Sequence, residues 1–150
     1  MIGATRVLVG GGTVLVAVAA AGLVLAGGAG GDDEDGGPLG PGPVTVALDI
    51  EHSAFSLDEI TVRAGTEVRF VVTNGDPILH ELIVGPPEVH RRHENGTEAA
   101  HPPRPGEVTI EPLSSATTTY LFADPGPIEF ACHLPGHLAY GMSGTVTVVP

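Results

Sequence analysis

Several residue types are absent or scarce in this chain of 150 residues. It contains no tryptophan, no lysine and a single cysteine. One cysteine cannot form an internal disulfide, so its thiol remains available for a metal ion or for chemistry. The basic residues are all arginines, six against 18 acidic residues, and the formal net charge is −12. This charge excludes nucleic acid as a partner, because nucleic-acid binding needs a basic surface.

Charged residues are also missing from a long N-terminal stretch. Arg6 is the only charge before an uncharged run that ends at Gly31, and residues 7–26 are mostly Val, Ala, Leu and Gly. We expect residues 1–31 to form either a signal peptide or an uncleaved membrane anchor, with a hydrophobic helix over residues 7–26. In both cases Arg6 stays in the cytoplasm and the rest of the chain lies outside. Residues 32–43 follow as an acidic, flexible Gly/Pro linker.

Residues 44–150 show the period-two alternation that is typical of β-strands. The chain has 22 Gly and 14 Pro, which favours short strands joined by turns over long helices. The pattern predicts an all-β sandwich or barrel of about eight strands. The expected strands cover residues 44–50, 60–62, 68–73, 79–84, 108–110, 117–122, 128–132 and 145–149.

A long polar excursion at residues 85–107 interrupts this pattern. It contains three histidines, and residues 89–100 are expected to form a short helix. On a helix His90, His93 and Glu94 would share one face, at i, i+3 and i+4. Together with His101 they would offer a second divalent-ion site. The interpretation that we favour is a charged, solvated flap.

The most informative stretch lies between the last two expected strands. Cys132, His137 and Met142 follow the spacing Cys-x4-His-x4-Met, and Met142 is the only methionine besides the initiator. A thiolate, an imidazole and a thioether are soft or borderline ligands, which favour copper over hard cations. His80, far upstream, supplies a second nitrogen. One Cys, two His and a distant Met predict a trigonal copper site with a weak axial thioether.

Other chemistries remain open for these residues. Taken singly, the cysteine, the methionine and the upstream histidine each have an ordinary explanation as buried core residues. A zinc hydrolase would use Cys132, His80 and His137 with Glu81 as base, and a thiol enzyme would use Cys132 with a histidine. Neither explains Met142. A binuclear copper centre would need two cysteines, and a multicopper oxidase would need several His-x-His pairs.

The stretch Cys132–His137, followed by Gly141-Met142, resembles the ligand loop of cupredoxins, the type 1 blue-copper proteins. Its spacing is similar to that of auracyanin and rusticyanin. The segment Asn74-Gly75-Asp76, followed by His80, resembles the first-ligand segment of the same family. The resemblance covers roughly residues 44–149. It implies a Greek-key β-sandwich that holds one copper ion, which cycles between Cu(II) and Cu(I).

By this resemblance the equatorial copper ligands would be His80, Cys132 and His137, and the axial ligand would be Met142. The protein would then be an extracytoplasmic electron carrier rather than an enzyme. Its partners would be redox proteins, which we expect to be membrane-associated respiratory components. The alternative is a copper-binding or copper-delivery protein of the same fold. The edge of His137 would lie at the surface, within an apolar collar of loop residues: Leu134, Pro135, Leu138 and Tyr140.

Two positions beside the expected ligands need separate comment. Glu81 stands directly after His80, where many cupredoxins have an asparagine. An ionised carboxylate close to the metal would favour Cu(II) and lower the reduction potential. His133 follows Cys132 and should point to the opposite side of its strand, so we expect it not to be a ligand.

Overall fold

The computed structural model describes residues 37–96 and 103–150. Within these ranges the chain forms nine strands, one α-helix and one short 3-10 helix. Their bounds are β1 Val44–Glu51, β2 Ala54–Phe55, β3 Glu59–Arg63, β4 Thr66–Asn74, β5 His80–Gly85, α1 Pro87–Glu94, β6 Glu107–Ile110, β7 Ser115–Phe122, β8 Gly126–Ala131, η1 Leu138–Tyr140 and β9 Ser143–Val149.

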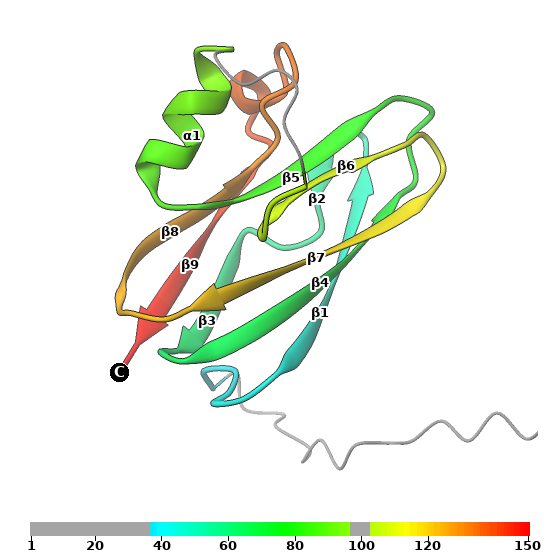
Figure 1. The fold of residues 1–150 in the computed structure, drawn as a ribbon. Helices are drawn as coiled ribbons and strands as arrows, with labels where there is room; N and C mark the ends of the chain where they lie inside the picture. Colours follow the sequence, from blue (N-terminus) through cyan, green and yellow to red (C-terminus); the bar gives the residue numbers. More distant parts are fainter. Residues whose placement is uncertain (1–36, 97–102) are drawn as a thin grey trace, which may run out of the picture. The chain divides into compact units, whose positions relative to one another are not determined.

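The strands form two facing sheets (Figure 1). One sheet has the order β2-β1-β4-β7 and the other has the order β3-β9-β8-β5-β6. β1 pairs with β4 in parallel, as does β3 with β9, and the remaining neighbours are antiparallel. The prediction of an all-β sandwich is confirmed.

The core between the sheets follows directly from the period-two pattern. Val46, Leu48 and Ile50 of β1 are buried while their neighbours in the strand are exposed. Phe70 and Phe130 contribute the largest buried side chains from opposite sheets. Each such ring contributes about 2–3 kcal/mol by its removal from water. The alternation therefore fixes which face of each strand turns inward, and with it the direction of the side chains at the strand ends.

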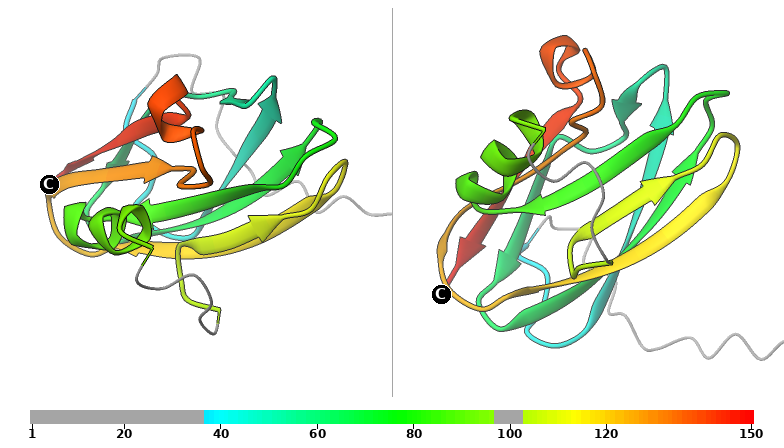
Figure 2. Two further views of the ribbon diagram at one scale, coloured as in Figure 1. Left: turned by 90° about the horizontal axis from the view of Figure 1, so that it is seen from above. Right: turned by 45° about the horizontal axis from the view of Figure 1, so that its top comes forward.

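Strand β5 breaks the alternation, because four of its six residues are buried in succession after Glu81. β5 lies between β8 and β6 in its sheet, and α1 packs against β5 and β8 from outside (Figure 2). A strand covered on both faces needs apolar residues on both. The helix of the excursion thus belongs to the body of the protein, and the prediction of a solvated flap is wrong for this part of it.

Most strand boundaries lie one or two residues from the predicted ones, and the helix ends at Glu94 instead of residue 100. β2 was not expected, because a strand of two residues leaves no periodic signal. The helix starts at Pro87 instead of residue 89, since proline is well tolerated in the first turn, where its missing N–H has no partner to lose. β8 ends at Ala131, so Cys132 already lies in the loop that follows.

Residues 37–43 of the expected linker at 32–43 are described, and Leu39 is hydrogen-bonded to β3: its N–H donates to Thr61 O at 2.9 Å and its carbonyl accepts the N–H of Arg63 at 2.8 Å. The signal peptide or anchor expected at 1–31 and residues 32–36 of the linker lie outside the described residues. The same holds for residues 97–100 of the expected helix and for His101. In the part of the chain that the structure describes, no helix has the length and apolar character needed to cross a membrane.

Candidate metal centre

The first expected ligand, His80, is the first residue of β5 and is fully buried. Its Nε2 lies 3.1 Å from Asp76 Oδ2. A carboxylate accepts hydrogen bonds, so Nε2 donates its hydrogen and Nδ1 carries a lone pair. This Nδ1 is buried and has no hydrogen-bond partner among the described residues. Burial lowers the pKa of His80, although the hydrogen bond to Asp76 acts in the opposite direction. The lowered pKa favours the neutral imidazole, which is the form that binds a metal.

Asp76 orients this histidine, and the sequence analysis missed that role. Its carboxylate accepts the backbone N–H groups of His52 at 2.8 Å and Ser53 at 2.7 Å. The pKa of Asp76 is lowered, chiefly by the Ser53 hydrogen bond, although burial acts in the opposite direction. A carboxylate behind a ligating histidine fixes its tautomer and ring orientation. The available signal was the position of Asp76 four residues before His80.

Asn74 holds the connection in which Asp76 lies. Its buried side chain donates from Nδ2 to the carbonyls of Ile78 at 2.8 Å and Glu111 at 3.1 Å, and its Oδ1 accepts the N–H of Asp76 at 2.9 Å. These bonds join the end of β4 to the residue that follows β6. The position of His80 is therefore set by two strands and not by a free turn.

The second expected ligand, Cys132, is also fully buried. Its Sγ lies 3.2 Å from Nδ1 of His137. Burial raises the pKa of the Cys132 thiol, while hydrogen bonds from the backbone of Glu81 and Leu134 act in the opposite direction. Metals bind the thiolate, so the two backbone donors stabilise the form of the sulfur that a metal requires.

The loop after Cys132 is short and strongly hydrogen-bonded. His137 N donates to Leu134 O at 3.0 Å, and Met142 N donates to His137 O at 3.1 Å. Gly136 and Gly141 adopt φ angles of 89° and 90°, a left-handed conformation that residues with a Cβ rarely adopt. The two glycines allow the turns that bring His137 back over Cys132.

Met142 follows the loop and is fully buried among the core residues. Its carbonyl accepts the N–H of Cys132 at 3.1 Å, so its backbone is attached to the cysteine as well as to His137. Gly144 allows the close approach of a side chain from β8. A Cβ at this position would collide with the ring of Phe130.

The structure brings three of the four expected ligands together. One donor atom each from His80, Cys132 and His137 lies within 4.8 Å of the others. The rings of His80 and His137 have centroids 4.8 Å apart and are tilted by 46°. Within residues 37–96 and 103–150 this is the one group of three or more such donors that is arranged to hold a metal. Two imidazole nitrogens and one sulfur suit a soft or borderline ion.

Glu81 occupies the position beside His80 and reaches the ligand loop. Its Oε1 accepts the backbone N–H of His133 at 2.8 Å. The carboxylate thus ties β5 to the residue after Cys132, and its charge acts to raise the pKa of the Cys132 thiol. The ring of His133 turns the other way and contacts His90 on α1. His133 is not part of the ligand group, as expected.

The second ion site, considered as an alternative to the flap, does not form among the described residues of the excursion. His90 is 4% exposed, and its ring nitrogens bond to backbone carbonyls and to His133. His93 Nε2 instead faces Glu107 Oε2 at 3.3 Å. The helical spacing of His90 and His93 was therefore predicted correctly. Their ring nitrogens, however, form hydrogen bonds that hold the helix against neighbouring parts of the protein. His101 lies outside the described residues.

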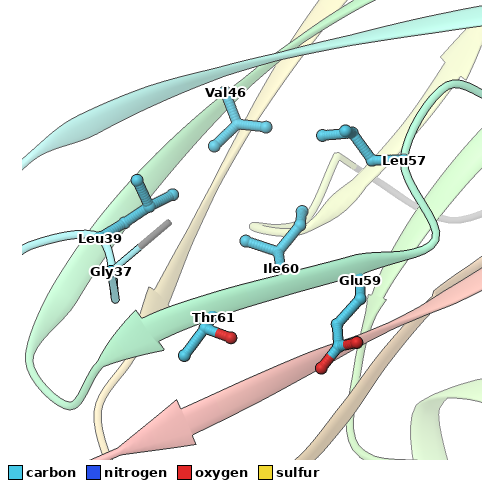
Figure 3. Close-up of a pocket in the computed structure, with 7 residues that line it drawn as sticks. All are labelled: Gly37, Leu39, Val46, Leu57, Glu59, Ile60 and Thr61. Carbon is cyan, nitrogen blue, oxygen red and sulfur yellow. The ribbon is translucent and has the colours of Figure 1, made fainter. Parts of the chain in front are cut away.

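A shallow hollow of about 390 Å³ lies elsewhere, between the edges of β1 and β3 (Figure 3). Figure 3 shows the side chains of Leu39, Val46, Leu57 and Ile60 turned toward it. None of its lining residues is a candidate ligand: Gly37, Leu39, Val46, Leu57, Glu59, Ile60 and Thr61. The His-Cys-His group is thus separate from this hollow.

Comparison with known proteins adds independent support. Residues 43–149 match the family model of copper binding proteins, plastocyanin/azurin family. The chain is 38% identical over 97 residues to the "copper-resistant cuproprotein CopI" of Rubrivivax gelatinosus, a match that covers 63% of this chain and 59% of that protein. It is 31% identical over 129 residues to the protein of the same name from Pseudomonas aeruginosa, covering 64% and 71% respectively.

Solved structures agree with the fold. Reduced auracyanin from Roseiflexus castenholzii superposes with a TM-score of 0.59 at 26% identity, over 71% of this chain and 97% of that chain. Reduced rusticyanin superposes with a TM-score of 0.53 at 16% identity, over 74% and 82%, and supports the fold alone.

The family match covers most of the chain, and the donor set identified above suits the metal of that family. An unpartnered imidazole nitrogen, a thiol and a second imidazole fit a single type 1 copper ion. The chain belongs to the plastocyanin/azurin family of copper-binding proteins, the cupredoxins.

Proposed function

We propose that this protein carries single electrons outside the cytoplasm, as a carrier and not as an enzyme. In this proposal His80, Cys132 and His137 hold the copper ion and Met142 is its weak axial ligand. The ion supplies the redox chemistry by cycling between Cu(II) and Cu(I). The observation that carries the proposal is the arrangement of His80, Cys132 and His137 around one point, with Asp76 and Asn74 already holding the first of them in place.

The role of the protein residues is to present a fixed set of donors. His80 and Cys132 are fully buried, which excludes water from them, and His137 is only partly buried. A rigid donor set changes little between the two oxidation states, which keeps electron transfer fast. The partly exposed ring of His137 offers the shortest path from the site to the surface.

The test is the spectrum of the copper-loaded protein. The Cu(II) form should be strongly coloured by charge transfer from the Cys132 thiolate, and it should bind one copper ion per chain. Cys132→Ser should remove the colour, whereas Leu121→Ser, at an exposed position of β7, should keep it. A colourless Cu(II) form of the unchanged protein would overturn the proposal.

A second candidate function is copper binding or delivery in copper resistance. It is favoured by the relatives, which are named copper-resistant cuproproteins. The chain spans 59% of the length of the Rubrivivax relative, so the activity of that whole protein does not transfer directly. The two functions differ in exchange kinetics. A carrier keeps copper in both oxidation states, whereas a delivery protein passes Cu(I) rapidly to an acceptor. The rate of Cu(I) transfer to a chelator of known affinity distinguishes the two functions: it should be slow for a carrier and fast for a delivery protein.

We also propose an extracytoplasmic location and membrane-associated respiratory redox partners. The support is the uncharged run after Arg6, which suits either export or anchoring through residues 7–26. Cell fractionation of the full chain, with mass determination of its N-terminus, tests the location and shows whether the segment is cleaved. Recovery of the protein in the cytoplasmic fraction would contradict it.

A further inference from the structure

Helix α1 is held against the sheet by a polar side chain. His90 is 4% exposed, and its Nε2 lies 3.1 Å from the carbonyl oxygen of Gly85 and 3.2 Å from that of Glu129. Carbonyl oxygens only accept hydrogen bonds, so Nε2 carries the hydrogen. These two carbonyls belong to β5 and β8, the neighbouring strands that lead to the copper ligands. The Nδ1 of His90 must therefore be an acceptor when the ring is neutral.

The acceptor Nδ1 of His90 faces a second histidine. It lies 2.8 Å from Nε2 of His133, which must then donate. The remaining nitrogen of His133, Nδ1, is buried without a hydrogen-bond partner in the described residues. The hydrogen bonds thus run in one direction, from His133 through His90 to the sheet backbone.

His133 is held at its backbone as well as at its ring. Its N–H donates to Glu81 Oε1 at 2.8 Å, and Glu81 follows His80 in the chain. On the other side His133 is bonded covalently to Cys132, whose own N–H donates to Met142. The hydrogen bonds to Glu81 and to His90 therefore both restrain the residue that directly follows Cys132.

We propose that His90 is a positioning residue of the copper centre, which fixes the direction of the Cys132 thiolate through His133 and makes α1 a brace for the ligand loop. Groups one step outside the ligands hold them in place, and their removal typically costs a factor of about 10–100 in metal affinity. The inference rests on the proposed copper site, and it gives a function to the excursion.

The burial of His90 supports positioning over two other roles. A solvated flap would leave the ring in water, and a separate metal site would leave its nitrogens available. Instead both nitrogens of His90 are engaged within the protein, one with the sheet and one with His133. A ring contact also links His90 to the loop, with its centroid 5.1 Å from that of His133.

The central experiment compares copper release and spectra of three variants. His90→Leu fills the buried position but cannot bond to His133, so copper should pass to a chelator about 10–100-fold faster, with a shifted charge-transfer band. His90→Gln has both a donor and an acceptor, and it should recover part of the loss. His93→Leu also changes a ring that stacks on His133 but keeps the His90–His133 hydrogen bond, and it should release copper like the unchanged protein.

A double change tests whether His90 acts through His133. In a His133→Leu background, His90→Leu should add little to the release rate, because the link is already broken. Fully additive effects, or a His90→Leu protein with unchanged release and spectrum, would overturn the proposal. If His90→Leu fails to fold, the proposal is tested on His90→Gln and His133→Leu. Both variants must release copper faster than His93→Leu for the proposal to hold. A colourless unchanged protein would instead contradict the copper site itself.

Discussion

Two side chains, Met142 as the proposed axial ligand and Glu81 beside His80, should determine how the reduction potential of the proposed copper site responds to substitution. Met142 is buried directly after the ligand loop, and Glu81 joins the strand of His80 to the residue after Cys132. One is a neutral, weak donor and the other is an ionisable acceptor. Changes at the two positions should therefore alter the reduction potential for different reasons, while the trigonal donor set remains.

Met142→Leu should keep the colour of the Cu(II) protein and raise its reduction potential. Leucine fills a similar volume but removes a weak thioether donor, which disfavours Cu(II) relative to Cu(I). Redox titration followed at the charge-transfer band measures the change. Loss of copper from this variant would mean that Met142 is more than a weak axial ligand.

Glu81→Gln should raise the potential by up to about 60 mV, which for one electron is a tenfold change in the equilibrium constant. The amide oxygen still accepts the N–H of His133, so the loop stays in place, but the negative charge near the thiolate is lost. Glu81→Leu serves as a comparison, because it removes both the charge and the hydrogen bond. A potential that falls in Glu81→Gln would contradict the electrostatic effect described here.

At the scale of elements, the ligand loop combines a rigid backbone with an exposed rim. Tyr140 in η1 is 89% exposed and Pro135 is exposed, while Leu134 and Leu138 are partly buried. Figure 1 shows α1 and this loop at the same end of the sandwich. These four residues are the ones expected to form an apolar collar around His137, and such a collar would suit a contact that forms and dissociates quickly.

Leu138→Asp should slow electron exchange with a redox partner and leave the visible spectrum unchanged. The added charge disturbs an apolar contact without touching a ligand. Stopped-flow exchange with a small inorganic oxidant is the control, since that reaction does not need the collar. Equal rates with the protein partner for the variant and the unchanged chain would place the exit face elsewhere.

The strands and the ligand set were predictable from sequence for a physical reason. Period-two alternation indicates a strand with one buried face. The spacing of Cys132, His137 and Met142 indicates that the three side chains come from one short loop. The hydrogen bonds from His133 to Glu81 and His90 were not predictable, because they join segments that are distant in the chain. The position of α1 was missed for the same reason, as its polar sequence conceals the buried His90. The contact of Asp76 with His80 is local, and its four-residue spacing was the signal that was missed.

For the whole molecule, the absence of lysine simplifies the alkaline titration. Burial raises the pKa of Tyr120, with a smaller effect of Glu88. The unfolded chain then loses this proton before the folded one, so the free energy of unfolding should fall as the pH rises above about 10. Urea unfolding between pH 8 and 11 measures the loss. Tyr120→Phe should reduce it, and an unchanged slope in this variant would contradict the assignment.

Removal of copper should lower the melting temperature by about 10 °C or more. The ion would bind the folded chain only, and a ligand at 100 times its dissociation constant adds about 2.7 kcal/mol. Calorimetry of copper-loaded and chelator-treated protein measures the difference. Cys132→Ser, with or without copper, should melt close to the chelator-treated protein, and a large copper effect in this variant would show that the ion stabilises the chain at another place.

The position of the ligands also bears on how long the protein survives. His80 comes from β5 and the other ligands from the loop after β8, so the ion would connect two neighbouring strands in a chain whose single cysteine cannot form an internal disulfide. A less stable chain is unfolded more often and is degraded faster by proteases. We therefore expect the abundance of the protein in cells to rise with the copper supply, even when its synthesis is constant.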